Sequence, residues 1–125
     1  MMLAIVDDDE DVRRALGRLL GSMGNKIALF ESAEDFEAAA VLVDCVVADV
    51  RLPGMSGLEL SDRLRKRRPP TPVVLITGDG DRLTHELARA VDAPLVTKPF
   101  DCADLAAAIR QAISKMDSLR ERYAR

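Results

Sequence analysis

Short aliphatic runs alternate with amphipathic stretches along the whole chain. Five runs rich in Val, Ile and Leu predict strands at residues 2–6, 26–30, 45–48, 72–76 and 94–97. Apolar residues at helical spacing predict helices over residues 9–20, from 32 to about 40, from 56 to before Pro69, from 81 to about 91, and from 101 onward. Several strand runs lack polar alternation, which is typical of a parallel sheet covered on both faces.

Local signals mark where these helices begin and end. Ser32 and Ser56 each precede an acid by three residues, as in a capping box. Asp9 and Asp101 are placed to cap the first and last helices. Gly21 and Gly24 are expected to end the first helix, and two consecutive prolines close the third.

The alternation of strands and helices predicts the fold class. We expect an α/β fold with a doubly wound, five-stranded parallel sheet, because each strand is followed by a helix that crosses over to the next strand. The strand order 2-1-3-4-5 is expected by analogy with flavodoxin-like sheets.

Composition narrows the class of protein. The 125 residues are 48% hydrophobic but only 3% aromatic, so the core must be aliphatic. A net charge of −3 gives no general attraction to nucleic acid or to anionic membranes. The longest apolar runs, residues 1–6 and 38–43, are too short to cross a bilayer, and no basic stretch precedes the first. Two cysteines, Cys45 and Cys102, favour a reducing, cytoplasmic location.

Polar residues follow four of the five predicted strands at the points where those strands end. They are Asp7 and Asp8, Asp49, Thr77, and Lys98. Because ligands of such sheets bind beyond the carboxyl ends of the strands, we expect three carboxylates, a hydroxyl and an ammonium to converge there.

This set of groups suits one kind of chemistry. Clustered carboxylates stay ionised beside a cation, and oxygen ligands in this number suit Mg²⁺. Carboxylate, Mg²⁺, lysine and hydroxyl together are suited to phosphoryl transfer. No Gly-x-x-x-x-Gly-Lys-[Ser/Thr] segment is present to hold a nucleotide. We therefore expect a carboxylate nucleophile that forms an acyl phosphate, and Asp49, on the central strand, is the best placed.

Four segments in this order resemble the receiver domain of bacterial two-component response regulators, over nearly the whole chain. The segments are Ile5-Val-Asp-Asp-Asp9, Val47-Ala-Asp-Val-Arg-Leu-Pro-Gly-Met-Ser-Gly57, Leu75-Ile-Thr-Gly78 and Thr97-Lys-Pro-Phe100.

The resemblance implies a role for each site residue. Asp49 would accept a phosphoryl group from the phosphohistidine of a sensor histidine kinase. Asp8 would bind Mg²⁺ directly and Asp7 largely through water, with Asp49 and the backbone carbonyl of Arg51 completing the metal site. Thr77 and Lys98 would bind phosphoryl oxygens, and the peptide bond after Lys98 is usually cis in this family. Such a domain catalyses only its own phosphorylation and dephosphorylation and is not a multiple-turnover enzyme.

The sequence departs from the family pattern at two places. Leu95 stands where the family usually has Tyr or Phe, which puts the usual coupling to the threonine in doubt. The segment between Thr77 and Lys98 is about one residue short, so we expect the helix at 81–91 to be short, shifted or irregular. We also hypothesise that Arg51 and Asp79 pair across the pocket and limit water access to the acyl phosphate.

The C-terminal end is similar to the stretch before the helix-turn-helix domain of FixJ-like transcription regulators. We expect a receiver domain at residues 1–117, with 118–125 extending the last helix or starting a linker to an output domain beyond Arg125. Such a domain would regulate transcription; a stand-alone receiver acting through protein–protein contacts is the alternative.

The family also implies partners. A homodimer would form through the helix at 81–91, the strand at 94–97 and the last helix, while direct contact with nucleic acid or membrane is not expected. The basic run at 63–68 is interpreted as a solvated helix end, and His85 as a surface residue. Neither cysteine has metal-ligand spacing.

Two other readings stay open. A phosphatase of the haloacid-dehalogenase type carries a second acid two residues after its nucleophile, as Asp7 and Asp9 are spaced. A degenerate receiver that works unphosphorylated, as a binding module, is compatible with Leu95.

Overall fold

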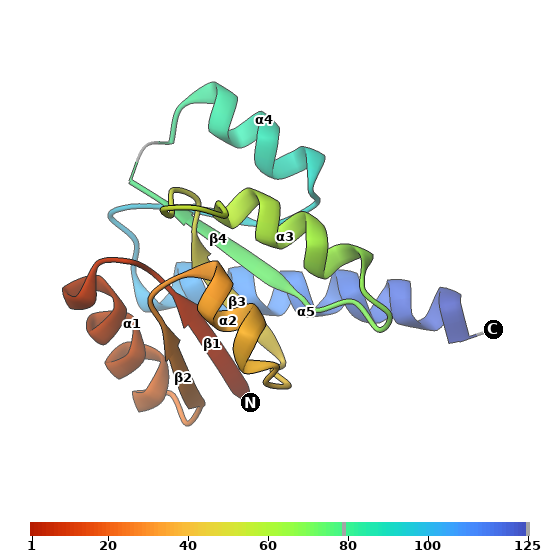
Figure 1. Ribbon diagram of the computed structural model, residues 1–125, viewed down its shortest axis with the longest axis horizontal. Helices are drawn as coiled ribbons and strands as arrows, with labels where there is room; N and C mark the ends of the chain where they lie inside the picture. Colours follow the sequence, from red (N-terminus) through yellow and green to blue (C-terminus); the bar gives the residue numbers. More distant parts are fainter. Residues whose placement is uncertain (79, 125) are drawn as a thin grey trace.

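Strands and helices alternate along the computed structural model, which describes residues 1–78 and 80–124 (Figure 1). The strands are β1 (Met2–Val6), β2 (Lys26–Phe30), β3 (Cys45–Asp49), β4 (Val73–Thr77) and β5 (Leu95–Thr97). The helices are α1 (Glu10–Ser22), α2 (Ala33–Ala39), α3 (Gly57–Lys66), α4 (Arg82–Ala90) and α5 (Cys102–Ala124).

The strands form one parallel sheet in the order β2-β1-β3-β4-β5, which confirms the predicted fold. The register aligns the carboxyl ends of the strands: Asp49 lies beside Ile76, and Thr77 lies beside Thr97. The polar residues that follow these strands therefore share one edge of the sheet.

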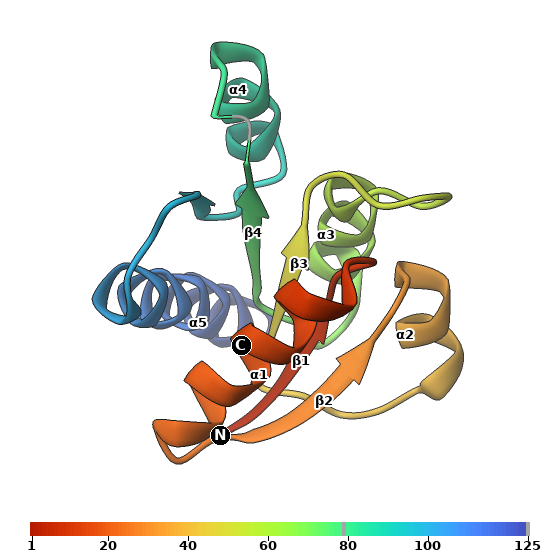
Figure 2. The same ribbon diagram turned by 90° about the vertical axis from the view of Figure 1, so that its left-hand side faces the viewer.

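Helices cover both faces of the sheet. Leu16 and Leu20 of α1 join Leu105 and Ile109 of α5 in the core on one face. On the other face the core takes residues from α2, α3 and, at Ala88, α4. Figure 2 shows the same division, with α1 and α5 on one side of the strands and α2 and α3 on the other. Burial on both faces explains why the strand sequences show little polar alternation.

Side-chain caps start the helices where the sequence predicts them. Asp9, Ser32, Ser56 and Asp81 are the N-caps of α1 to α4, and each side chain accepts a backbone N–H from the first turn. The first helix extends slightly beyond its predicted end at residue 20. Gly21 lies inside α1, which ends at Ser22, and the chain turns at Gly24, where φ is +90°.

Some strand limits also differ from the prediction. Asp49 and Thr77 are the last residues of their strands and do not follow them. Pro72 and Pro94 lie just outside β4 and β5, because proline has no N–H for the hydrogen bonds of the sheet. The helix between them, α4, is short but regular over nine residues.

The basic run at the end of α3 is held by ion pairs. Arg65 and Lys66 contact Asp62 on the same helix, each at 2.8 Å. Arg63 and Arg67 reach Glu37 of α2. These two acids offset part of the positive charge, in accord with a solvated helix end. Among the described residues, no helix is both long enough and apolar enough to cross a membrane.

Candidate functional site

Asp49 ends the central strand, and its carboxylate is oriented by the loop that follows. The Asp49 side chain is 15% exposed. Its Oδ1 accepts the N–H of Arg51 at 2.8 Å, while the N–H of Val50 donates to the carbonyl of Ile76 at 2.8 Å. A Cβ at Gly57 would overlap the carbonyl oxygen of Asp49, so only glycine allows α3 to start this close to β3.

Lys98 brings a positive charge to Asp49 from the far side of β4. Its Nζ lies 3.7 Å from Asp49 Oδ2, and its side chain is 35% exposed. The Lys98 N–H donates to the carbonyl of Thr77 at 2.9 Å, which fixes the start of the loop after β5. The peptide bond between Lys98 and Pro99 is cis, as the resemblance implied.

Asp7 is a buried carboxylate with one oxygen left without a donor. It is only 2% exposed. Its Oδ1 accepts the N–H of Asp9 at 2.9 Å, whereas Oδ2 is buried and has no hydrogen-bond partner among the described residues. Burial raises the pKa of Asp7 to about 6, the N–H of Asp9 acts against this, and the charge of Asp49 raises it further. A buried carboxylate oxygen beside a second carboxylate is a favourable place for a cation.

The other predicted site residues lie around these three. Asp8 follows Asp7 and is exposed, and its charge is the smallest of the influences that raise the pKa of Asp7. Thr77 is 2% exposed at the end of β4, and Arg51 is an exposed residue of the loop after β3.

The expected convergence of three carboxylates is not present as a complete set of metal ligands. Within residues 1–78 and 80–124, no group of three or more acids, histidines or cysteines is placed to hold a metal ion together. The periodicity of a strand fixes where Asp8 is attached but not where its side chain goes. Mg²⁺ still fits the site, because it usually binds one or two carboxylates and keeps several waters.

A model of the family described as "Response regulator receiver domain" matches residues 3–110. The chain belongs to the response regulator receiver domain family.

Several curated proteins are similar to this receiver domain. The transcriptional regulatory protein FixJ of Azorhizobium caulinodans is 40% identical over 114 residues, which cover 89% of this chain and 54% of the relative. FixJ of Bradyrhizobium diazoefficiens is 36% identical over 90% of this chain and 57% of its own length. The receiver thus spans about half the length of these relatives.

Several solved structures also have a similar fold. A crystal structure titled FixJ-N has a TM-score of 0.81 and 34% identity, and covers 90% of this chain and 93% of that one. The response regulator StyR has a TM-score of 0.81 at 33% identity, over 98% of this chain and 64% of that one.

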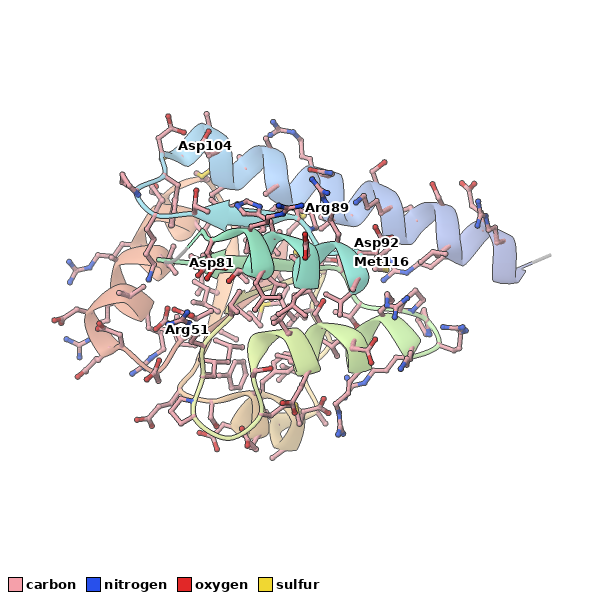
Figure 3. The ribbon with its side chains drawn as sticks, turned by 90° about the horizontal axis from the view of Figure 1, so that it is seen from above. Arg51, Asp81, Arg89, Asp92, Asp104 and Met116 are labelled. Carbon is pink, nitrogen blue, oxygen red and sulfur yellow. The ribbon has the colours of Figure 1, made fainter. Side chains whose placement is uncertain are left out.

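The hypothesised partner of Arg51, Asp79, lies outside the described residues. A neighbouring acid does feel the charge of Arg51. The pKa of Asp81 is lowered, chiefly by hydrogen bonds from Thr84 and to a smaller extent by the charges of Arg51 and His85. Figure 3 shows Arg51 and Asp81 at the same end of the receiver.

Asp9 is occupied as a helix cap. Its Oδ1 accepts the N–H groups of Asp11 at 2.9 Å and Val12 at 3.3 Å. This use agrees with the prediction for Asp9, and it leaves the spacing of Asp7 and Asp9 without the second free acid that the phosphatase reading needs.

One residue near the site was missed by the sequence analysis. Glu34, in the first turn of α2, accepts the N–H of Met55 at 2.9 Å from the loop between β3 and α3. In the sequence Glu34 resembles any acid that stabilises a helix N-terminus, so no signal in a single sequence distinguishes it.

Proposed function

We propose that this receiver domain accepts a phosphoryl group on Asp49 from the phosphohistidine of a sensor histidine kinase, and that the added charge switches an output surface. The observation that carries the proposal is the pairing of a carboxylate at the end of the central strand with an ammonium: Asp49 Oδ2 and Lys98 Nζ are 3.7 Å apart. The Asp49 carboxylate is partly exposed and would attack the phosphoryl donor, and the lysine would supply positive charge for the transferred group.

The transfer balances without a further reactant. A carboxylate oxygen of Asp49 forms a bond to phosphorus while the bond from phosphorus to the imidazole nitrogen breaks, and the electron pair returns to that nitrogen. Lys98 and the hydroxyl of Thr77 then hold phosphoryl oxygens. Asp8, Asp49 and the backbone carbonyl of Arg51 would hold Mg²⁺, with Asp7 acting largely through water, and the ion would supply further positive charge for those oxygens.

The buried Asp7 supports a cation at this edge. Its unpartnered Oδ2 and its raised pKa favour a cation beside that oxygen. A divalent ion there would favour the ionised form of Asp7.

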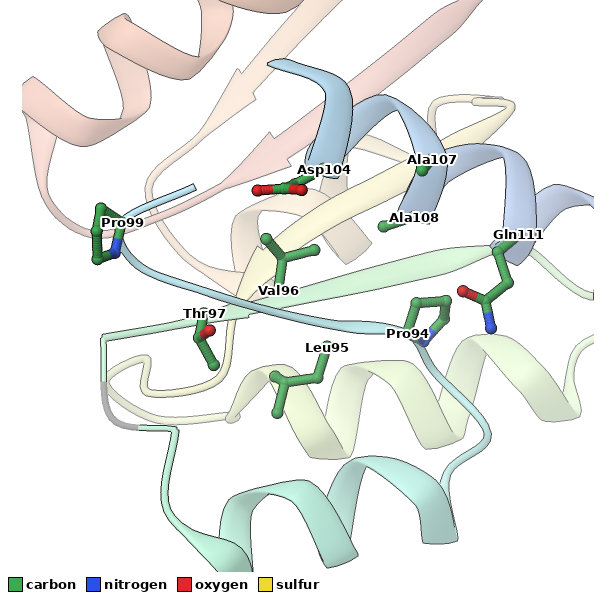
Figure 4. A pocket seen from close by; sticks show the side chains of 9 residues that line it. All are labelled: Pro94, Leu95, Val96, Thr97, Pro99, Asp104, Ala107, Ala108 and Gln111. Carbon is green, nitrogen blue, oxygen red and sulfur yellow. The ribbon is translucent and has the colours of Figure 1, made fainter. Parts of the chain in front are cut away.

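The surface that would respond lies over α4, β5 and α5. Leu83 and Leu87 of α4 are exposed, at 62% and 42%. A cavity of about 480 Å³ is lined by residues of β5 and α5, and in Figure 4 Val96 points toward Ala108 of α5 whereas Leu95 points to the opposite face of β5, toward α4. Leu95 therefore places an aliphatic side chain on the α4 face of β5, at the position where the family usually has an aromatic one. A homodimer through this surface is part of the proposal.

The regulators similar to this receiver suggest its output. The FixJ proteins are named as transcriptional regulators, and the receiver spans about half of their length. We propose that a DNA-binding domain beyond Arg125 is the output in the cytoplasm, with a stand-alone receiver as the alternative. The coding sequence after Arg125 distinguishes the two.

Acetyl phosphate provides the test. The wild-type receiver and Asp49→Asn are incubated with acetyl phosphate, with Mg²⁺ or with EDTA, and their intact masses are measured. We expect one base-labile phosphoryl group per wild-type molecule with Mg²⁺, mapped to Asp49, and none in the variant or in EDTA. An unchanged wild-type mass contradicts the proposal, as does steady release of phosphate from a phosphomonoester, which the phosphatase reading requires.

A further inference from the structure

Backbone hydrogen bonds fix both ends of the loop between β3 and α3. The N–H of Val50 donates to Ile76 of the neighbouring strand, and the carbonyl of Val50 accepts the N–H of Gly57 at 3.0 Å. Val50 and Leu52 are buried, at 6% and 8% exposure. Beyond Leu52 the loop is exposed through the turn at Pro53 and Gly54.

A side chain from α2 contacts this exposed turn. Glu34 Oε2 accepts the N–H of Met55 at 2.9 Å across a sequence separation of 21 residues. The carboxylate lies so close to Gly54 that a Cβ there would overlap it, and Gly54 has a φ of +74°, which glycine adopts readily. The turn thus fits around the carboxylate.

Glu34 projects from a well-fixed segment. Its neighbour Ala33 is fully buried and Phe36 is 3% exposed. The ring of Phe36 meets that of Phe30 edge to face, with centroids 5.4 Å apart. The hydrogen bond from Met55 is the main reason why the pKa of Glu34 is lowered, so the carboxylate accepts it in its ionised form.

We propose that Glu34 is a positioning residue for the phosphorylation site: through the N–H of Met55 it holds the turn at 53–55, and with it the carbonyl of Arg51 that the proposed function assigns to Mg²⁺. The inference rests on that proposed function. Glu34 touches neither the metal nor the phosphoryl group, and acts only by fixing the backbone between Asp49 and α3. Losing it leaves the Arg51 carbonyl less well ordered in the metal-free protein.

The test compares Glu34→Ala and Glu34→Gln with Glu31→Ala. Glu31 is an exposed acid three residues earlier, with no side-chain hydrogen bond or ion pair among the described residues. The Mg²⁺ concentration that half-saturates phosphorylation by acetyl phosphate is measured for each protein, with thermal unfolding to confirm the fold. We expect about a two- to tenfold increase for Glu34→Ala, the range that corresponds to one hydrogen bond. Glu34→Gln, which keeps an acceptor oxygen, is expected to restore part of the loss, and Glu31→Ala to match wild type.

A second readout needs no phosphorylation. Amide hydrogen exchange of Met55, followed by NMR in EDTA, is expected to be faster in Glu34→Ala than in wild type or Glu31→Ala. The Gly54→Ala substitution adds a check: it is expected to cost less stability in the Glu34→Ala background, where the overlapping carboxylate is gone.

The proposed function and the role of Glu34 can be overturned separately. A wild-type domain that takes up no phosphoryl group overturns the proposed function and, with it, the role of Glu34 in that reaction. A Glu34→Ala variant with wild-type Mg²⁺ dependence and wild-type exchange at Met55 overturns the inference about Glu34 while Asp49 remains the acceptor.

Discussion

The helices α3 and α4 follow neighbouring strands, yet they are held to the receiver very differently. α3 buries four residues of its ten, and two of them, Leu60 and Leu64, are fully buried leucines. α4 buries only Thr84 and Ala88 of its nine, and leaves two leucines exposed. Figures 1 and 2 show α4 at the outer edge of the receiver, and Figure 3 shows Arg89 toward its C-terminal end.

The difference in packing matches the role proposed for each helix. α3 begins against the carbonyl of Asp49, so a mobile α3 would disturb the proposed phosphorylation site. α4 follows Thr77, which is proposed to bind the transferred group, and a lightly packed helix moves at little cost when that residue changes partners. In a two-state switch of this kind, Asp49 and α3 would stay fixed while the loosely packed α4 changes position.

The largest expected effect tests the packing directly. Leu64→Ala is expected to destabilise the receiver by about 2–5 kcal/mol, because it empties a fully buried position of α3. Leu83→Ala on α4 is expected to change stability by less than about 0.5 kcal/mol, because that leucine is 62% exposed. Urea unfolding measures both, and equal losses would remove the contrast between the helices.

The buried carboxyl of Asp7 is expected to make the stability of the receiver depend on pH. Its pKa is raised from 3.8 to about 6 in the folded state, so between these values the folded protein keeps a proton that the unfolded chain releases. Without divalent ions, this group makes stability fall as pH rises through that window, by about 1–3 kcal/mol in total.

The comparison with Asp7→Asn isolates this contribution from other carboxylates. Both proteins are unfolded with urea in EDTA from pH 4 to pH 6.5. The decrease in the free energy of unfolding that Asp7 causes as pH rises is expected in wild type only. Identical pH profiles would mean that the carboxyl of Asp7 titrates normally. Added Mg²⁺ is expected to restore stability to the wild type at neutral pH more than to the variant.

The helix caps give a smaller and sharper test. Ser56 Oγ accepts the N–H of Glu59 at 3.1 Å, and Asp81 Oδ1 accepts that of Thr84 at 2.7 Å. Ser56→Ala is expected to lower the global free energy of unfolding by about 1 kcal/mol. Asp81→Ala is expected to speed amide exchange within α4 and to change global unfolding less than Ser56→Ala does. A global loss from Asp81→Ala as large as that from Ser56→Ala would show that α4 unfolds together with the core.

The sequence predicts the strands, the helix caps and the edge of the sheet where the site lies, but not the directions of all the site side chains. The aliphatic runs reveal the five strands because residues covered on both faces are apolar throughout, and the caps appear because serine and aspartate serve as local acceptors. Strand ends place Asp49 and Lys98 at one edge correctly. They do not reveal that Asp8 is exposed while Asp7 is buried, because side-chain direction after a strand depends on the loop.

Long-range contacts of exposed residues were equally hidden. Glu34 and Met55 are 21 residues apart, and each has an ordinary local role in its own segment. The loose packing of α4 was not predicted: the segment between Thr77 and Lys98, about one residue short of the family pattern, predicted only a short, shifted or irregular helix. Its exposed leucines at 83 and 87 have helical spacing and would suit a buried face equally well.

Amide hydrogen exchange of the phosphorylated receiver tests the central claim most directly. Wild type and Asp49→Asn are compared with and without acetyl phosphate and Mg²⁺, and exchange is followed in peptides from α3 (57–66) and α4 (82–90). The account predicts that exchange changes in α4 of the phosphorylated wild type, with α3 unchanged and the variant silent. Phosphorylation of Asp49 that alters α3 as much as α4, or alters neither, would contradict it.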